Sequence, residues 1–407
     1  MNDINKNKQH IILYIPMCLL LSYWGYMKVA LPVIPDLLHS FQTTQNLLNQ
    51  FISLAFILSG LSSIFWGVLI DRFEIKRFLI YLTSIGIIIL ASISITTNVW
   101  FWGINYIVGA ILMGGLVVCS RSFVMIYLTE EADIKKALTM PMVAGFFAAF
   151  FMPYISGWLA SFLGWNYAFF IIPLWLILLL ILLFKLPPST QTINKNIRIK
   201  DNIKAMFLHL KNKTFLFNIL GIACISSISQ SYYIAIIFWL MANYSIPIQS
   251  LALYLFPLLF PGMIIPLFIQ KIYQKVNEKK MITVYVTLLF IAAFTAFILY
   301  IIFNMSAAFS SWLWVIPGVL CTITLVCLVP ILSFRALNSV KENYNSASGL
   351  LTISVYCAAG FGIYINSFIT LTHFYLEGIF IFVAASLLIL CIRKSIENPV
   401  SIEQTPR

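Results

Sequence analysis

The sequence predicts an all-α integral membrane protein whose twelve transmembrane helices form two six-helix bundles. Hydrophobic residues make up 61% of the 407-residue chain and charged residues only 9%, whereas about a quarter of a soluble domain is charged. So few charges cannot cover a water-exposed surface of this size, and lipid must therefore surround most of the chain. Twelve apolar runs, with one long polar stretch after the sixth, complete the pattern.

Each apolar run is long enough to cross a bilayer, for which a helix needs about 20 mainly apolar residues. The first run follows the polar stretch MNDINKNKQH, which has no short apolar core with a small-residue cleavage site and is therefore expected to be a cytoplasmic tail. The expected spans are 11–35, 47–70, 78–97, 101–124, 138–162, 167–186, 214–241, 249–270, 281–303, 311–334, 346–369 and 372–392.

The distribution of lysine and arginine predicts the orientation. Basic residues follow the second, fourth, sixth, eighth, tenth and twelfth spans, whereas the intervening loops TTNVW, LGWN, NYSIPIQ and NMSAAF contain none. Positive charge marks the cytoplasmic side of a membrane protein, so both termini are expected to be cytoplasmic. The net charge of +12 is thus interpreted as an orientation signal and not as a nucleic-acid-binding surface.

The polar stretch 187–213 divides the chain into equal halves. The expected domains are an N-terminal bundle (1–186), a cytoplasmic linker (187–213), a C-terminal bundle (214–395) and a cytoplasmic tail (396–407). The segment QKIYQKVNEKKMI of the second half lies where GVLIDRFEIKR lies in the first, as a diverged copy would. Two such halves are typical of transporters with a central site that rocking exposes alternately to each side.

The charged segment GVLIDRFEIKR, between the second and third spans, resembles the signature of the major facilitator superfamily. Glu74 stands where the family usually has Gly, and the alternative is an ordinary charged turn. The resemblance implies the major facilitator fold and a loop that latches the two halves together on the cytoplasmic side. Its expected gate residues are Gly67, Asp71, Arg72, Lys76 and Arg77, and Leu69 also matches the pattern.

Three further segments resemble the twelve-helix bacterial drug:proton antiporters of the Bcr/CflA branch. They are ALPVIPDLLHSF at 30–41, PYISGWLASFLGWNYAFF from Pro153, and NSASGLLTIS from Asn345. This resemblance implies proton-coupled efflux of a small drug-like or metabolite solute, and it implies that the membrane is a bacterial inner membrane. The chain departs from the branch where Asn105 replaces a usual Arg and Val108 a usual Gln, and also at Met152 and Ser156.

Lys28 is a charged residue inside the first span, eight residues before Asp36 and hence about 12 Å from the outer end. Such a charge is costly unless it faces a water-filled cavity or a partner, although its long stem could instead reach the outer interface. In this superfamily helices one, four, seven and ten line the cavity. The candidate substrate-binding residues are Tyr23, Trp24, Lys28, Asn105, Ser226, Gln230, Tyr233 and, from the eleventh span, Tyr356. Ser229 lies on the same polar side of the seventh span, Thr322, Thr324 and Tyr356 are the weaker candidates, and interhelical hydrogen bonds or packing are the alternative to substrate contact.

Two acids bear on the charge of the expected cavity. Asp36 and Glu377 are expected at the outer ends of the first and last spans, which leaves a cavity with a cation and no buried acid. Such a cavity favours anionic or zwitterionic solutes over cationic drugs. The alternative function is therefore export of an anionic natural product such as a carboxylate siderophore, or uptake of a zwitterionic metabolite.

Pro153 and Gly157 form an expected hinge in the fifth span, because proline removes a helix hydrogen bond and glycine allows close approach. The alternative is a static kink.

The sequence carries none of the enzyme signatures HExxH, GxSxG or a Walker loop, so no catalytic residues are expected. Its four histidines and seven cysteines lack metal-ligand spacing, and no metal or cofactor is expected. The expected partners are a small-molecule substrate, protons as the coupling ion and the lipid bilayer around a monomer. A receptor with this fold is a third possibility, which retained ligand binding without flux would identify.

Overall fold

The computed structural model describes residues 2–127, 131–187, 199–246, 248–275, 277–305, 310–340, 344–366 and 373–397. Throughout these ranges the regular elements are helices: α1 (Asn2–Val29), η1 (Leu31–Val33), α2 (Ile34–Phe41), α3 (Gln45–Arg72), α4 (Ile75–Ile93), α5 (Val99–Tyr127), α6 (Glu131–Leu163), α7 (Trp165–Phe184), α8 (Ile199–Leu210), α9 (Lys213–Tyr244), α10 (Ile248–Lys275), α11 (Glu278–Met305), η2 (Ser311–Trp314), α12 (Val315–Asn338), α13 (Tyr344–Asn366) and α14 (Tyr375–Glu397).

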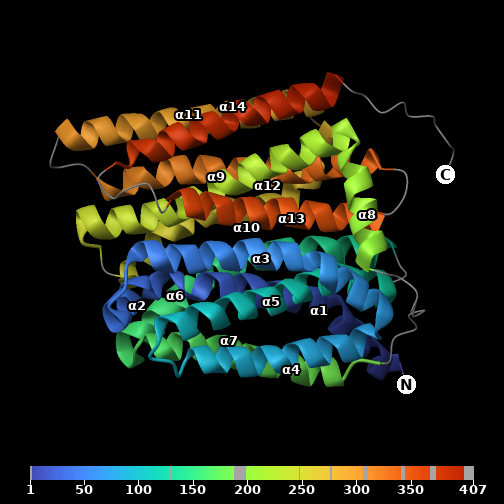
Figure 1. The fold of residues 1–407 in the computed structure, drawn as a ribbon. Coiled ribbons are helices and arrows are strands. Elements are labelled where there is room, and N and C mark those ends of the chain that lie inside the picture. The colour runs from blue at the N-terminus through green and yellow to red at the C-terminus, as the bar shows by residue number, and fades with distance from the viewer. Residues whose placement is uncertain are drawn as a thin grey trace.

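The long helices form two bundles that lie side by side (Figure 1). Helices α1–α7 pack on one another in the first bundle, and α9–α14 do so in the second. Within the described ranges, eleven helical spans are long and apolar enough to cross a membrane, and α10 adds a shorter apolar segment, Leu253–Phe268. The predicted fold of twelve membrane helices is confirmed.

The outer surface of the bundles is apolar, as a lipid-facing surface must be. Large hydrophobic side chains such as Ile88 (69% exposed), Phe162 (70%) and Phe294 (65%) point away from the core. Helices that are hydrophobic on all sides belong in a membrane, where each helix satisfies its own backbone hydrogen bonds.

The first span is broken near its end, which its sequence explains. Pro32 lies in η1 and Pro35 in the first turn of α2, and neither has the N–H that would continue a helical hydrogen-bond ladder. The chain therefore changes from α1 through η1 to α2, and Lys28 lies in the last turn of α1, just before the break. Most of α1, together with η1 and α2, makes up the first span, Tyr14–Phe41.

Two pairs of helices make the most extensive contacts between the bundles, α3 with α13 and α6 with α10. Glycines allow the close approach in both pairs. A Cβ atom on Gly360 of α13 would lie 2.7 Å from the backbone oxygen of Ser53, whose hydroxyl donates a 2.8 Å hydrogen bond to the Gly360 carbonyl. A Cβ atom on Gly262 of α10 would overlap the ring of Phe146.

The stretch expected as a polar linker contains a helix, α8, which crosses one end of the molecule (Figure 1). It contacts α3 of the first bundle and α9 and α13 of the second. Residues 188–198 of the expected linker and 398–407 of the expected tail lie outside the described residues. The end of the bundles that carries α8 is called the α8 end, and the opposite end, which carries α2, is called the α2 end.

Candidate functional site

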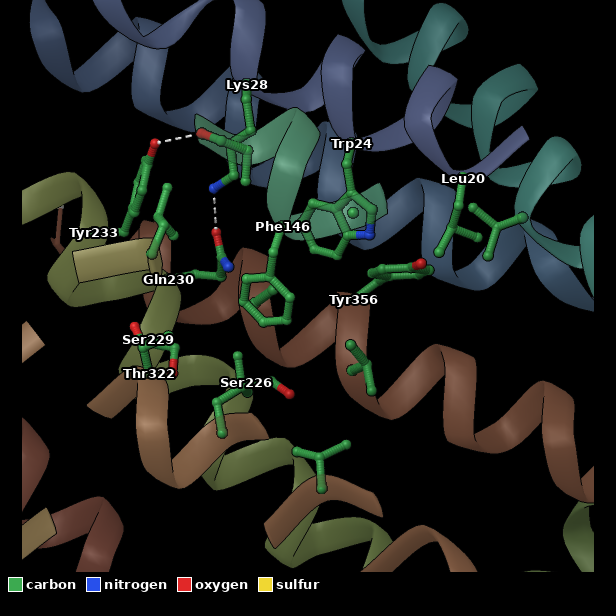
Figure 2. A pocket seen from close by; sticks show the side chains of 18 of the residues that line it. Leu20, Trp24, Lys28, Phe146, Ser226, Ser229, Gln230, Tyr233, Thr322 and Tyr356 are labelled. Carbon is green, nitrogen blue, oxygen red and sulfur yellow. Dashed lines mark hydrogen bonds between the residues drawn. The ribbon is translucent and has the colours of Figure 1, made fainter. Parts of the chain in front are cut away.

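A cavity of about 380 Å³ lies between the two bundles. Helices α1, α5 and α6 of the first bundle and α9, α10, α12 and α13 of the second supply its lining. Figure 2 shows side chains from both bundles pointing into this space. A volume of a few hundred cubic ångströms is typical of sites for small molecules.

Lys28 lies at the edge of this cavity with only 3% of its surface exposed. Its ammonium group donates a 2.8 Å hydrogen bond to Oε1 of Gln230 and lies 3.9 Å from the centre of the Tyr233 ring (Figure 2). Both partners are on α9, so the lysine of the first bundle reaches across to the second. The alternative, in which the long stem of Lys28 reaches the outer membrane interface, does not describe this geometry.

Lys28 has no carboxylate partner among the described residues. Ion pairs that the structure describes, such as Arg77 with Glu74 and Arg335 with Glu278, lie at the surface. A neutral amide and an aromatic face stabilise an ammonium group without cancelling its charge. Among the residues that line the cavity Lys28 is the basic one and none is acidic, so its protonated form gives the cavity a net positive charge.

Tyr233 connects the bundles a second time. Its hydroxyl donates a 3.2 Å hydrogen bond to the carbonyl of Ala149 on α6. Ala149 is four residues before Pro153, which has no N–H to bond that carbonyl within the helix. The predicted hinge proline thus leaves free the acceptor that Tyr233 uses. Gly157, the other hinge residue, lies one turn further along the same continuous helix.

Aromatic rings form one wall of the cavity. Trp24 lies one turn before Lys28 on α1 and packs edge-on against Tyr356 of α13, with 6.0 Å between ring centres. Tyr23 lies behind this wall and does not line the cavity, because its ring packs on Tyr356 at 4.8 Å and its hydroxyl bonds Ser59. Flat rings beside a cation suit a ligand that carries both an anionic and an apolar part.

Hydroxyl groups from α9 supply further polar contacts. Ser226 and Ser229 line the cavity, and neither hydroxyl oxygen has a hydrogen-bond partner in the described structure. Rotation about χ1 would direct each of them at a ligand atom. Thr322 of α12 also lines the cavity, whereas Thr324 bonds the carbonyls of Tyr285 and Leu320 and lies outside it.

The structure brings together six of the eight predicted substrate-binding residues at the cavity: Trp24, Lys28, Ser226, Gln230, Tyr233 and Tyr356. Asn105 lies elsewhere, since its amide donates to the Phe101 carbonyl and its oxygen accepts from Ser92 of α4. Asn105 therefore faces a neighbouring helix and does not line the cavity, although it stands at the sequence position where the branch usually has an arginine.

Among the lining residues that were not predicted from the sequence are one aromatic and two hydroxyl side chains. Phe146 of α6 projects into the cavity (Figure 2). Ser120 of α5 and Ser333 of α12 also line it, in the parts of their helices that are nearer the α8 end. The lining thus extends from Lys28 toward the α8 end. Phe146 is one of many phenylalanines, and a single serine in a span is common, so no sequence signal separated these residues from their neighbours.

Contacts of two basic residues hold the predicted gate loop within the first bundle. Arg77 forms a 2.9 Å ion pair with Glu74, the residue that replaces the usual glycine. Lys76 donates to the carbonyls of Phe184 and Leu186 at the end of α7. Gly67 and Arg72 lie in the last part of α3, and the side chain of Asp71 lies outside the described residues.

The expectation that the last span has no buried acid was wrong. Glu377 lies in the first turn of α14, near the end of the span as expected, but it is 0% exposed. Helices α9 and α11 continue past it, and Asn366 at the end of α13 lies against its carboxyl group, so that it is removed from solvent. It does not line the cavity around Lys28, whose net charge is unaffected.

Two solved transporters share this fold. A bacterial homologue of the human lysosomal transporter Spinster, in an inward-facing and unoccupied conformation, is 15% identical over 98% of this chain and 99% of its own, with a TM-score of 0.67. The POT family transporter PepTSo is 13% identical over 97% of this chain and 99% of its own, with a TM-score of 0.72. No curated protein matches the sequence. The family model described as Major Facilitator Superfamily matches residues 17–333, and the chain therefore belongs to that superfamily of membrane transporters.

Proposed function

We propose that this protein is a secondary active transporter that exports a small organic anion or zwitterion by proton-coupled alternating access. Lys28 carries the proposal, because it is a buried cation at a cavity between the two bundles and its described partners are neutral. An anionic group of the solute binds the ammonium, and the hydroxyls of Ser226 and Ser229 bind its other polar atoms. Trp24 and Tyr356 pack against its apolar part.

The movement follows from the arrangement of the bundles. The halves bounded by the linker 187–213 rock about the solute, which breaks the Tyr233 contact and opens the α3–α13 and α6–α10 interfaces in turn. Gly67, Asp71, Arg72, Lys76 and Arg77 gate the α8 end, and Pro153 with Gly157 lets α6 bend. By the positive-inside rule, the α8 end and both termini are cytoplasmic, in a bacterial inner membrane. One chain forms the whole cavity, so a monomer suffices.

Flux into proteoliposomes tests the proposal. The probes are citrate as an anion, taurine as a zwitterion and ethidium as a cation, with a pH gradient imposed. We expect citrate or taurine to be transported and Lys28→Met to abolish that transport. Lys279→Met is the matched control, because Lys279 is an exposed lysine at the start of α11 and should leave flux unchanged. Citrate or taurine flux that persists in Lys28→Met would refute the role of Lys28.

A second candidate function is efflux of cationic drugs, which the sequence resemblance to the Bcr/CflA branch favours. Its solute would stack on Trp24 and Tyr356, and a neutral residue 28 should then increase its binding. Ethidium flux that is larger than citrate and taurine flux, and that rises in Lys28→Met, would favour this second function over the first.

A further inference from the structure

Glu377 is a buried carboxyl group that the substrate cavity does not use. Its Oε2 atom accepts a 3.0 Å hydrogen bond from the hydroxyl of Ser231 on α9 and lies 3.5 Å from the amide nitrogen of Asn366 on α13. Its Oε1 atom is buried and has no hydrogen-bond partner in the described structure. An acidic oxygen without a donor is rare in a protein interior, because leaving it unpaired is costly.

No basic side chain compensates for this carboxyl group within the part of the chain that the structure describes. The ionisable groups near enough to interact with it are Tyr232 of α9 and Cys321 of α12, which are neutral. On α11, the neighbours of the adjacent Gly378 are Ala293, Ala296 and Phe297. On its own segment, His373 is exposed and packs on Tyr375.

The sequence extends this observation to the neighbouring stretch that the structure leaves undescribed. Residues 367–372, which join α13 to this segment, read SFITLT and carry no charge. An ionised and unpaired carboxylate at this depth would cost several kcal/mol. The least costly state of Glu377 in this conformation is therefore the neutral acid.

Helix α9 joins Glu377 to the substrate cavity. Gln230 accepts the hydrogen bond from Lys28, and the next residue, Ser231, donates the hydrogen bond to Glu377. Successive residues of a helix point in directions about 100° apart, so one turn of α9 contacts the cavity on one side and α14 on the other. A shift of this turn alters both contacts.

We propose that Glu377 is the proton-binding site that couples transport to a proton gradient. This role rests on the proposed function for its coupling to flux, although proton binding at Glu377 does not require it. When the α2 end opens, water reaches the carboxyl group and its proton leaves as hydronium. The contacts that Ser231 and Asn366 already make with the carboxyl group then become charge-assisted hydrogen bonds and strengthen, which pulls α9 and α13 toward α14. Protonation of the carboxylate reverses these changes.

Infrared difference spectroscopy tests proton binding without any solute. The purified protein in lipid is titrated with acid and base while the C=O stretch of protonated carboxyl groups is recorded. We expect a titrating band that Glu377→Gln removes and Asp36→Asn retains, because Asp36 is a half-exposed acid of α2 at the same end. A band that is unchanged in Glu377→Gln would overturn the proposal.

A pair of spin labels tests whether the proton moves the bundles. Lys185→Cys at the end of α7 and Lys279→Cys at the start of α11 place labels on opposite bundles at the α8 end, in a background without the native cysteines. We expect the distance between the labels to change with pH in the parent and not in Glu377→Gln. A distance that changes with Na⁺ and not with pH would instead identify a metal-cation site and overturn the proton proposal.

Flux measurements link the site to transport. In proteoliposomes, Glu377→Gln should reduce citrate or taurine flux driven by a pH gradient by about tenfold or more. Exchange of labelled for unlabelled solute, which moves no net proton, should persist in the same variant. Equal loss of both would show that Glu377 only maintains the fold. If the parent moves neither solute while the infrared band behaves as expected, the proposed substrate class fails and the proton site stands.

Discussion

The hydroxyl of Tyr233 bonds the carbonyl of Ala149, and this contact joins the two bundles at a point of α6 where Pro153 supplies no N–H for the helix's own acceptor. Tyr233 also lies under the ammonium group of Lys28. The same side chain therefore helps to hold the cation and to close the space between the bundles. A solute that displaces Lys28 from Tyr233 would act directly on this contact.

Tyr233→Phe should destabilise the protein because it leaves the Ala149 carbonyl without a donor. The expected loss is about 1 kcal/mol, measured as thermal stability in detergent. In a Pro153→Ala background the loss should be smaller, since residue 153 then supplies the N–H and the helix satisfies the carbonyl. Tyr26→Phe is the control, because its hydroxyl bonds the Tyr106 carbonyl inside the first bundle. A loss for Tyr233→Phe that is the same in both backgrounds would contradict this explanation.

The two unpaired serines predict an effect on binding without an effect on stability. Ser226→Ala and Ser229→Ala should each weaken solute binding by about fivefold, or about 1 kcal/mol, and leave the melting temperature unchanged or higher. Ser53→Ala should do the reverse, because its hydroxyl bonds the Gly360 carbonyl across the bundles. Isothermal titration and thermal melts measure the two effects. A lower melting temperature in either cavity variant would show that the serine has a partner in the protein.

Gly360→Ala should separate α3 from α13. The added methyl group meets the Ser53 backbone oxygen, which no side-chain rotation can move, so about 1–3 kcal/mol of stability should be lost. Gly221→Ala is the matched control, since its methyl group meets only the flexible ends of Leu332 and Leu388 at 3.1 Å. Thermal melts and a cross-link between cysteines placed at the α3–α13 interface report the change. If both alanine variants have the same stability, the contact at Gly360 is not limiting.

The gate loop predicts unequal roles for two adjacent basic residues. Lys76→Met should lower stability by about 1 kcal/mol because it removes donors from the carbonyls at the end of α7. Arg77→Met should change stability by about 0.5 kcal/mol or less, since its ion pair with Glu74 is at the surface. Chemical unfolding of the reconstituted protein compares them. Equal losses would show that Lys76 acts as a general surface charge.

The sequence was most informative where a side chain conflicts with its surroundings. Lys28 stands out in an apolar span, and helical spacing then placed Trp24 on its face and Gln230 and Tyr233 on a polar stripe of α9. Asn105 is equally conspicuous, but the sequence did not show which side of its helix faces the cavity. No sequence pattern distinguishes an asparagine that lines a cavity from one that bonds a neighbouring helix, as Asn105 bonds Ser92.

Burial at the ends of spans was the least predictable feature. The position of Glu377 near the start of a helix suggested exposure, whereas depth depends on how far neighbouring helices reach beyond it, which only the tertiary structure determines. Similarly, the polar composition of the linker gave no indication of α8. The burial of Met206 in this helix depends on contacts with other helices, which the sequence does not show.

Helix α8, through its buried residue Met206, opposes opening of the transporter at the α8 end. The methyl group of Met206 touches Gly349 of α13, and α8 also contacts α3 on the other bundle. Because α8 packs on both bundles, separation of the halves at the α8 end must break its contacts with α3 or with α9 and α13. Helix α8 therefore adds to the free energy that opening this end of the transporter requires.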